Sequence, residues 1–134
     1  MDVNGSCHCG AVQFEARVDL KRVGVCHCTD CQIFSGSAFR TSVLVGGSDF
    51  QLLKGNPVGY EKTAESGSQR QLFFCGRCGT HLYGANPGAQ DPIYSVRVGV
   101  LAQRAQVPPV VQVWCRSEVD WLPGLDEIRR VETQ

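Results

Sequence analysis

Seven of the chain's eight cysteines lie in three tight clusters, and a cysteine thiolate is a strong ligand for zinc. The clusters are a C-x-C pair, a C-x-C-x-x-C trio and a C-x-x-C pair: Cys7 and Cys9, then Cys26, Cys28 and Cys31, then Cys75 and Cys78. Four thiolates complete a tetrahedron around zinc, whereas three leave one position open for water or a substrate. The spacing therefore predicts two zinc ions, a structural one held by the two pairs and a catalytic one held by the trio.

A glycine follows each of the two pairs, Gly10 after the first and Gly79 after the second. Sulfurs on one zinc lie about 3.8 Å apart, because each Zn–S bond is ~2.3 Å long. Residues two apart on an extended strand are about 6.6 Å apart, so the chain has to curl inward at such a pair. Glycine permits that turn. The alternative interpretation is that the two pairs are unrelated buried thiols.

The trio lacks an obvious fourth ligand. His27 lies between two of its cysteines, so its side chain points the opposite way in an extended segment. His81 is closer in sequence to the four-cysteine site. Cys115 stands alone after Trp114, and we expect it to be a small buried apolar residue. Water or a substrate atom is then the fourth ligand, unless the trio is purely structural and a partner donates one.

A zinc ion rich in thiolates prefers soft donors, so a thiol is a natural guest at the open position. Coordination holds that thiol as the nucleophilic thiolate, and an aldehyde is the logical second substrate. Zinc can equally polarise the aldehyde's carbonyl oxygen. His27 is the candidate partner or proton carrier near this zinc, or else a histidine bonded to a neighbouring strand. Three arginines are candidates to bind a substrate carboxylate, although arginines on strands are more often solvated: Arg40, Arg70 and Arg97.

Length and composition suit one globular domain over residues 1–134, with 43% hydrophobic and 19% charged residues. Thirteen basic and 13 acidic residues argue against a surface for nucleic acid. No basic stretch precedes an apolar one at the N-terminus, and no run reaches the ~20 apolar residues of a membrane helix. We therefore expect a cytoplasmic protein, in which reduced cysteines bind metal rather than form a disulfide scaffold.

Alternating apolar and polar residues predict strands along most of the chain. The expected strands are Ala11–Ala16, Val23–Cys26, Ala38–Val45, Phe50–Leu53, Gln69–Cys75, Ile93–Val100 and Val110–Cys115. Their close spacing, with Gly, Pro and Asn between them, favours antiparallel sheets. Two short segments look helical, Thr29–Phe34 and Leu125–Val131. Trp114 and Trp121 are expected in the core. The predicted class is thus all-β, with one or two short helical turns.

Three motifs resemble those of the glutathione-dependent formaldehyde-activating (GFA) enzymes. They read G-S-C-H-C-G-A-V (Gly5–Val12), C-H-C-T-D-C-Q-I-F-S-G-S-A-F (Cys26–Phe39) and F-C-G-R-C-G-T-H-L (Phe74–Leu82), with a weaker W-L-P-G-L (Trp121–Leu125). The resemblance implies a β-tent fold of folded antiparallel sheets. It also implies a structural zinc on the two pairs and a catalytic zinc on the trio. The reaction that names the family joins formaldehyde to glutathione, and it is classed as a carbon–sulfur lyase in reverse.

These observations predict a zinc-dependent carbon–sulfur lyase that acts on thiol–aldehyde adducts resembling S-hydroxymethylglutathione. Its partners would be a small thiol and an aldehyde, or their adduct, and neither nucleic acid nor a membrane. Two alternatives belong to other classes. One is a non-catalytic zinc-binding interaction module, and the other is a zinc hydrolase whose open site activates water against an imine-like substrate.

Overall fold

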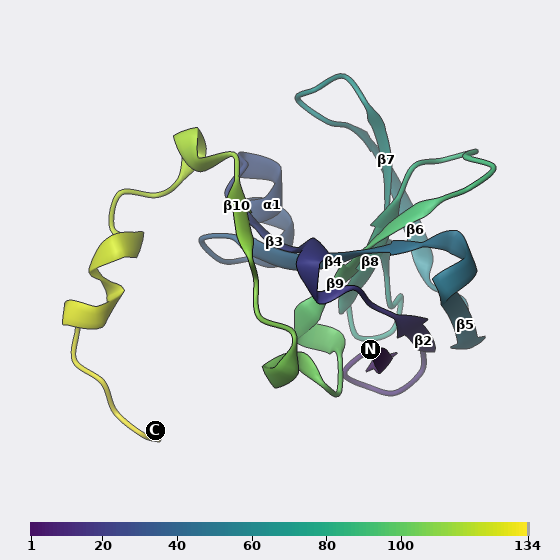
Figure 1. The fold of residues 1–134 in the computed structure, drawn as a ribbon, viewed down its shortest axis with the longest axis horizontal. Helices are drawn as coiled ribbons and strands as arrows, with labels where there is room; N and C mark the ends of the chain where they lie inside the picture. Colours follow the sequence, from purple (N-terminus) through teal and green to yellow (C-terminus); the bar gives the residue numbers. More distant parts are fainter. Residues whose placement is uncertain (134) are drawn as a thin grey trace.

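The computed structural model describes residues 1–133, which form two β-sheets with one α-helix (Figure 1). The smaller sheet has the order β1 (Asp2–Ser6), β2 (Gln13–Arg17), β5 (Phe50–Lys54). The larger has the order β10 (Val111–Val113), β3 (Val23–Cys26), β4 (Arg40–Gly46), β9 (Ile93–Arg97), β8 (His81–Ala85), β7 (Gln69–Phe74), β6 (Val58–Thr63). The helix α1 spans Thr29–Ser35. Short 3-10 turns occupy Leu20–Arg22, Gly47–Asp49, Val98–Val100, Arg104–Gln106, Cys115–Ser117 and Leu122–Glu127.

The predicted all-β class is confirmed, with one difference in strand direction. Strand pairs in both sheets run antiparallel, except that β10 lies parallel to β3, with Val113 opposite Cys26. Parallel neighbours need a long connection between them. Here most of the chain separates β3 from β10, so the last strand returns to the edge of the sheet beside the trio.

Apolar side chains between the two sheets form the core. On β2 the alternation predicted from sequence buries Phe14 and Ala16. The Phe50 ring packs on those of Phe14 and Tyr94, with ring centroids 5.1 and 4.4 Å apart. Tyr83 of β8 meets Phe14 edge to face at 6.2 Å. One face of the larger sheet is therefore buried against the smaller sheet.

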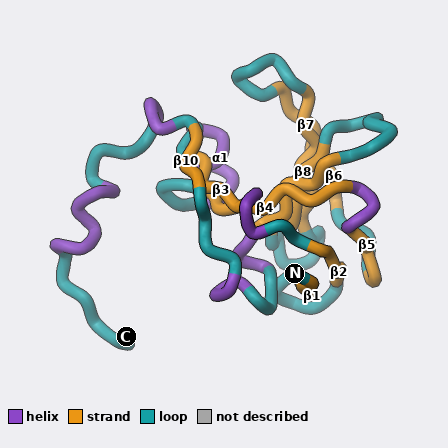
Figure 2. Tube along the Cα trace, in the orientation of Figure 1, coloured by secondary structure: helices purple, strands orange, loops and turns teal. Residues whose placement is uncertain are grey.

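The opposite face of the larger sheet carries α1. Phe34 of the helix lies 5.9 Å from the Tyr60 ring on β6 and 5.8 Å from the His81 ring on β8. Figure 2 shows the helix beside β3, away from β1 and β2. The two faces thus differ in role, because one builds the core and the other holds the segment that contains the trio.

Three expectations for the C-terminal region are wrong. The helical segment predicted at Leu125–Val131 is instead a 3-10 turn over Leu122–Glu127. Trp121 is 61% exposed rather than buried, and Trp114 is only partly buried. Cys115 is exposed because β10 is an edge strand, so residues near it pack on one neighbour only. Figure 1 shows this segment, in yellow, extending away from the sheets.

No helix within residues 1–133 has the length and apolar character needed to cross a bilayer.

Candidate metal centres

The two cysteine pairs come together into one four-sulfur cluster. All four Sγ atoms lie within 4.8 Å of one another. The Cys7 and Cys9 sulfurs are 3.6 Å apart, and the Cys9 and Cys75 sulfurs 3.8 Å. Sulfurs on one tetrahedral zinc are separated by about 3.8 Å. The cluster therefore fits a zinc ion by donor type, donor number and spacing.

Local backbone turns aim these sulfurs at one point. Gly10 and Gly79 both adopt positive φ, 73° and 74°, a conformation that costs glycine little. The Gly79 amide donates to the Cys75 carbonyl oxygen at 2.8 Å, which closes the turn of the second pair. In the first pair, the Val12 amide donates to the Cys7 sulfur at 3.2 Å. Such N–H donors stabilise a thiolate, as a metal ligand has to be.

The four-sulfur cluster joins the two sheets. Cys7 follows β1 of the smaller sheet, and Cys75 follows β7 of the larger sheet; both are buried. Cys9 and Cys78 are exposed, so one side of the cluster faces solvent. The Cys78 pKa is lowered to about 5, chiefly by the Thr80 hydroxyl 3.2 Å from its sulfur. Ligation here would crosslink segments that are far apart in the sequence.

The trio forms a second, separate cluster at the junction of β3 and α1. Cys26 ends the strand, Cys28 is the N-cap residue of the helix, and Cys31 lies in its first turn. Their sulfurs lie within 4.8 Å of one another, and no fourth ligating side chain among residues 1–133 belongs to this group. The Cys31 amide donates to the Cys28 sulfur at 3.4 Å, so the helix start itself shapes the cluster.

One thiol of the trio ionises easily even without a metal. The Cys26 pKa is lowered to about 5, above all by the hydrogen bond from Cys31, with further help from the Cys28 amide and from Arg40. The Cys31 pKa is raised, first because Cys31 is the donor of that hydrogen bond and second because it is buried. The lowered Cys26 pKa favours a thiolate in this cluster at neutral pH.

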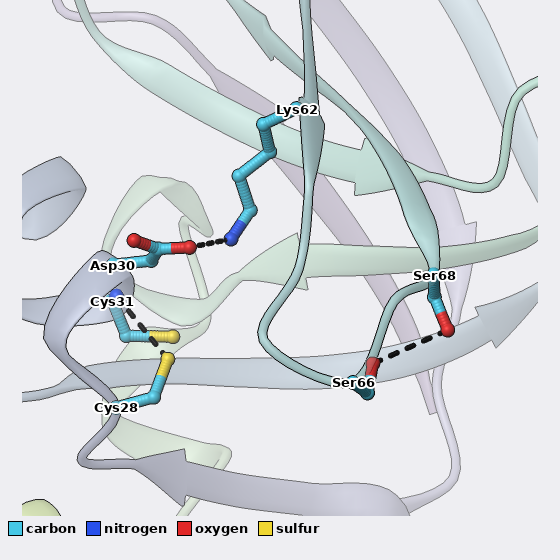
Figure 3. A network of polar contacts seen from close by, with 6 residues as sticks. All are labelled: Cys28, Asp30, Cys31, Lys62, Ser66 and Ser68. Carbon is cyan, nitrogen blue, oxygen red and sulfur yellow. Dashed lines mark hydrogen bonds and ion pairs between the residues drawn. The ribbon is translucent and has the colours of Figure 1, made fainter.

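Four contacts hold α1 and its cysteines in place. The Gln32 amide nitrogen donates to the carbonyl oxygens of His27 at 2.7 Å and Ser117 at 2.8 Å, which ties the helix to β3 and to the chain after β10. Asp30 forms an ion pair with Lys62 of β6 (Figure 3). The Lys62 ammonium also lies 6.0 Å from the Phe34 ring centroid. The helix is therefore fixed from both ends of the larger sheet.

His27 does not lie on the side of the sheet that faces the trio. Its ring is 1% exposed, and Nε2 lies 2.7 Å from the Gln112 amide oxygen on β10. The ring meets Phe39 edge to face at 5.8 Å and lines a cavity of about 820 Å³ with Leu122 and Val25. A role for His27 as a proton carrier stays a prediction. In this structure, its contact with the site is the carbonyl oxygen that Gln32 binds.

Sequence reasoning named Arg40 and Arg97 among three candidate arginines but did not place either of them on the sheet face of the trio. Arg40 is the cross-strand partner of Cys26, and Arg97 is buried at 6% exposure on β9. His81, nearer to the four-cysteine cluster in sequence, stacks between Phe34 and Phe74 instead. The available signal was Arg97, which lies inside the apolar stretch Ile93–Val100. Arginine is seldom buried unless its charge is paired, so its presence there indicates a partner for that charge.

The fold and the two clusters define a β-sheet protein that could hold two metal ions on cysteine. A solved protein of Rhodobacter sphaeroides has the same fold, with a TM-score of 0.63 and 21% identity; the alignment covers 82% of this chain and 99% of that one. The chain belongs to the family described as glutathione-dependent formaldehyde-activating enzymes, whose sequence model matches residues 2–117. A Schizosaccharomyces pombe protein named an uncharacterised lyase is 26% identical over 96 residues, 69% of this chain. The chain spans 64% of that relative's length.

Proposed function

We propose that this protein is a zinc-dependent carbon–sulfur lyase that acts on adducts of a thiol with an aldehyde, of the S-hydroxymethylglutathione type. The observation that carries the proposal is the three-sulfur cluster, which includes no fourth ligating side chain among residues 1–133. Three thiolates around zinc leave a position for substrate. Membership of the GFA family and a relative named a lyase support the same class of reaction.

The proposed zinc ligands are Cys26, Cys28 and Cys31 at the open site, and the two pairs at the closed one. Zinc bound by the trio would supply a Lewis acid that stabilises negative charge on the substrate's sulfur or oxygen. The protein's own residues set the field around that charge. Arg40 is the cross-strand partner of Cys26 and helps to lower its pKa, so positive charge stands beside the reacting position.

The reaction in the lyase direction breaks the C–S bond of the adduct R–S–CH₂–OH. The bonding electron pair stays with sulfur as thiolate, the hydroxyl group gives its proton to water, and its oxygen becomes the carbonyl oxygen of formaldehyde. The reverse reaction forms the same bond from a thiolate and an aldehyde. Both directions need only a site that holds a thiolate and that lets water reach the hydroxyl group to accept or return its proton.

Cobalt substitution tests thiol entry directly. Co²⁺ in place of zinc absorbs visible light, and we expect the spectrum to change when glutathione is added, because sulfur enters the metal's coordination shell. Cys31→Ser should lose this response. An unchanged spectrum in the native sequence would contradict thiol coordination and leave the interaction module or the hydrolase as the better interpretation.

Turnover needs its own measurement, because thiols and formaldehyde also combine unaided. The rate of formaldehyde release from S-hydroxymethylglutathione should exceed the protein-free rate in the zinc-loaded protein. The matched control is Cys115→Ser, since Cys115 is exposed and lies in neither cluster. We expect this variant to keep the full rate and Cys31→Ser to fall to the protein-free rate.

A further inference from the structure

Three buried nitrogen atoms on the trio's side of the larger sheet have no hydrogen-bond partner. They are Arg40 Nε, Arg97 Nη2 and His81 Nδ1, and only one other such side-chain atom occurs among residues 1–133. Leaving a buried donor unpaired costs roughly 1–3 kcal/mol, and more for a charged group. Such atoms are rare in folded proteins unless a bound molecule satisfies them. Their concentration at one place therefore points to a ligand.

Strand register places both guanidinium groups on the same sheet face as the trio. Cys26 pairs with Arg40 across β3 and β4, and Ser42 pairs with Arg97 across β4 and β9. Paired residues on antiparallel strands share a face, as do residues two apart on one strand. Cys26, Arg40, Ser42 and Arg97 consequently all project from the face that α1 covers.

Hydrogen bonds hold the Arg97 guanidinium in a fixed position and leave its Nη2 atom without a partner. Its Nη1 donates to the Ser42 hydroxyl at 3.2 Å and to the Ser95 carbonyl oxygen at 3.1 Å. Its Nη2 reaches over β8, where a Cβ atom added to Gly84 would lie 3.8 Å away. The Arg97 side chain is thus fixed through one nitrogen, and its other terminal nitrogen is free to donate a hydrogen bond to a bound acceptor.

Neither arginine has a carboxylate of its own. The ion pairs formed within residues 1–133 are Arg17–Asp2, Lys62–Asp30 and Arg116–Glu65, so Arg40 and Arg97 take part in none. Burial and the nearby Arg40 lower the Arg97 pKa to about 9, while the sulfurs of Cys31 and Cys26 oppose that change. Arg97 is therefore still charged at neutral pH, and the negative charges that act on it are those of Cys31 and Cys26.

Charge balance then favours an anionic guest. Three thiolates with one Zn²⁺ carry a single net negative charge, whereas Arg40 and Arg97 carry two positive charges. A thiolate bound to the zinc would compensate the one remaining positive charge. Net charge therefore does not by itself require a second anionic group, whereas the unpartnered nitrogens of Arg40 and Arg97 require a hydrogen-bond acceptor. A planar guanidinium matches a carboxylate better than any other common small anion except phosphate.

We propose that Arg40 and Arg97 form a carboxylate-binding subsite beside the trio, so that the preferred thiol of this protein is one that bears a carboxylate. This inference rests on the proposed function for the identity of the thiol group. His81 lines the subsite as a neutral imidazole, because burial first and the two arginines next lower its pKa. The competing explanation is that the arginines only compensate the charge of the thiolates.

The test compares two thiols that differ in one group, 3-mercaptopropionate and 3-mercaptopropionamide. Each is titrated into the cobalt-substituted protein, and the dissociation constants are read from the absorption change. We expect the native sequence to bind the carboxylate at least about tenfold more tightly, the equivalent of about 1.4 kcal/mol. Arg40→Gln should abolish most of this preference. Because the charge of Arg40 also favours a bound thiolate, the variant should weaken both thiols, and the ratio of the two dissociation constants is the quantity that tests the subsite.

Control variants separate the subsite from general effects of charge and folding. Arg70→Gln removes an exposed strand arginine that is bonded to Asn86, and it should leave the tenfold preference unchanged. Arg97→Lys retains the buried charge but loses the planar fork, and it should reduce the preference without loss of metal. A variant Arg40→Gln that weakens both thiols equally would overturn the proposal in favour of charge compensation, as would equal binding of both thiols by the native sequence.

A second measurement works even if no thiol enters the metal site. Propionate, which has no thiol, is titrated into the zinc-loaded protein labelled with ¹⁵N, and the side-chain Nε–H signals of arginine are followed. We expect saturable shifts of the Arg40 and Arg97 signals and none for Arg70. An absence of shifts would overturn the subsite, whereas shifts without a cobalt response to thiols would retain the subsite and refute the proposed function.

Discussion

The two cysteine clusters use the same ligand but connect very different lengths of chain. In the four-sulfur cluster, Cys9 and Cys75 are 66 residues apart, whereas Cys28 and Cys31 in the trio are three residues apart. Closing the longer loop restricts the unfolded chain more, by a term on the order of 2–3 kcal/mol from loop length alone. We propose that loop length, in addition to ligand count, distinguishes the cluster that would hold the fold together from the cluster that would be free to do chemistry.

The clusters also differ in their electrostatic surroundings. The Cys78 pKa is lowered to about 5 by hydrogen bonds from Thr80 and from neighbouring cysteines, without a charged side chain. At the trio, the Cys26 pKa is lowered by neighbouring thiols and also by the positive charge of Arg40. Only the trio thus has cationic side chains among the groups that shift its pKa values, as a site for an anionic substrate requires.

The largest expected effect is loss of the four-sulfur cluster. Cys75→Ser removes a buried ligand that joins the two sheets. Structural zinc contributes about 10–16 kcal/mol of apparent free energy in zinc peptides, which exceeds or matches the ~5–15 kcal/mol net stability of a domain. We expect an unfolded or insoluble chain by circular dichroism, whereas Cys115→Ser should fold normally. A well-folded Cys75→Ser variant would show that this cluster does not hold the fold.

The next effect is a selective loss of metal. Cys31→Ser should lower the zinc content from two ions per chain towards one while the circular dichroism spectrum stays unchanged, because the trio closes only short loops. Elemental analysis of the purified variant measures this result. If Cys31→Ser and Cys75→Ser behave alike, the proposal that only the four-sulfur cluster holds the fold is wrong.

Sequence patterns predicted the segments whose residues interact locally. The helix expected at Thr29–Phe34 is α1 at Thr29–Ser35, and the strand expected at Val23–Cys26 is β3. Local signals mark both segments, since Gly36 ends the helix at a φ of 64° and β3 follows the alternation of its own residues. The grouping of cysteines was likewise accessible, because motif spacing limits where their sulfurs can meet.

Features that depend on distant neighbours could not be predicted in this way. Strand β1 reads D-V-N-G-S, and its Gly5 is required by packing, because a Cβ atom there would lie 2.0 Å from the Phe14 ring. Which arginine is buried depends on the pairing of β9 with β4. The exposure of Cys115 depends on β10 being an edge strand. No periodicity within one segment encodes these relations.

A smaller effect distinguishes the glycines that serve the two clusters. Gly79 and Gly36 both have positive φ, and a Cβ atom added to either would meet nothing within 4 Å. Alanine at each should therefore lower the free energy of unfolding by about 1–2 kcal/mol through backbone strain alone. Gly79→Ala should in addition weaken zinc binding at the four-sulfur cluster, and Gly36→Ala should not. Urea unfolding and competition with a zinc chelator measure the two quantities, and equal zinc affinities in the two variants would contradict a role of Gly79 in aiming the ligands.

The smallest effect concerns the attachment of the trio's helix to the sheet. Lys62 and Asp30 form an ion pair whose side chains are 15% and 41% exposed, and such partly solvated pairs contribute about 0.2–1 kcal/mol. Lys62→Ala should therefore leave global stability within about 1 kcal/mol of the native value. It should nevertheless speed hydrogen exchange in α1 more than near Cys7, because the pair fixes only the helix that bears Cys31. Equal acceleration at both clusters would mean that the trio and the four-sulfur cluster open together as one cooperative unit, which would contradict the proposed difference between them.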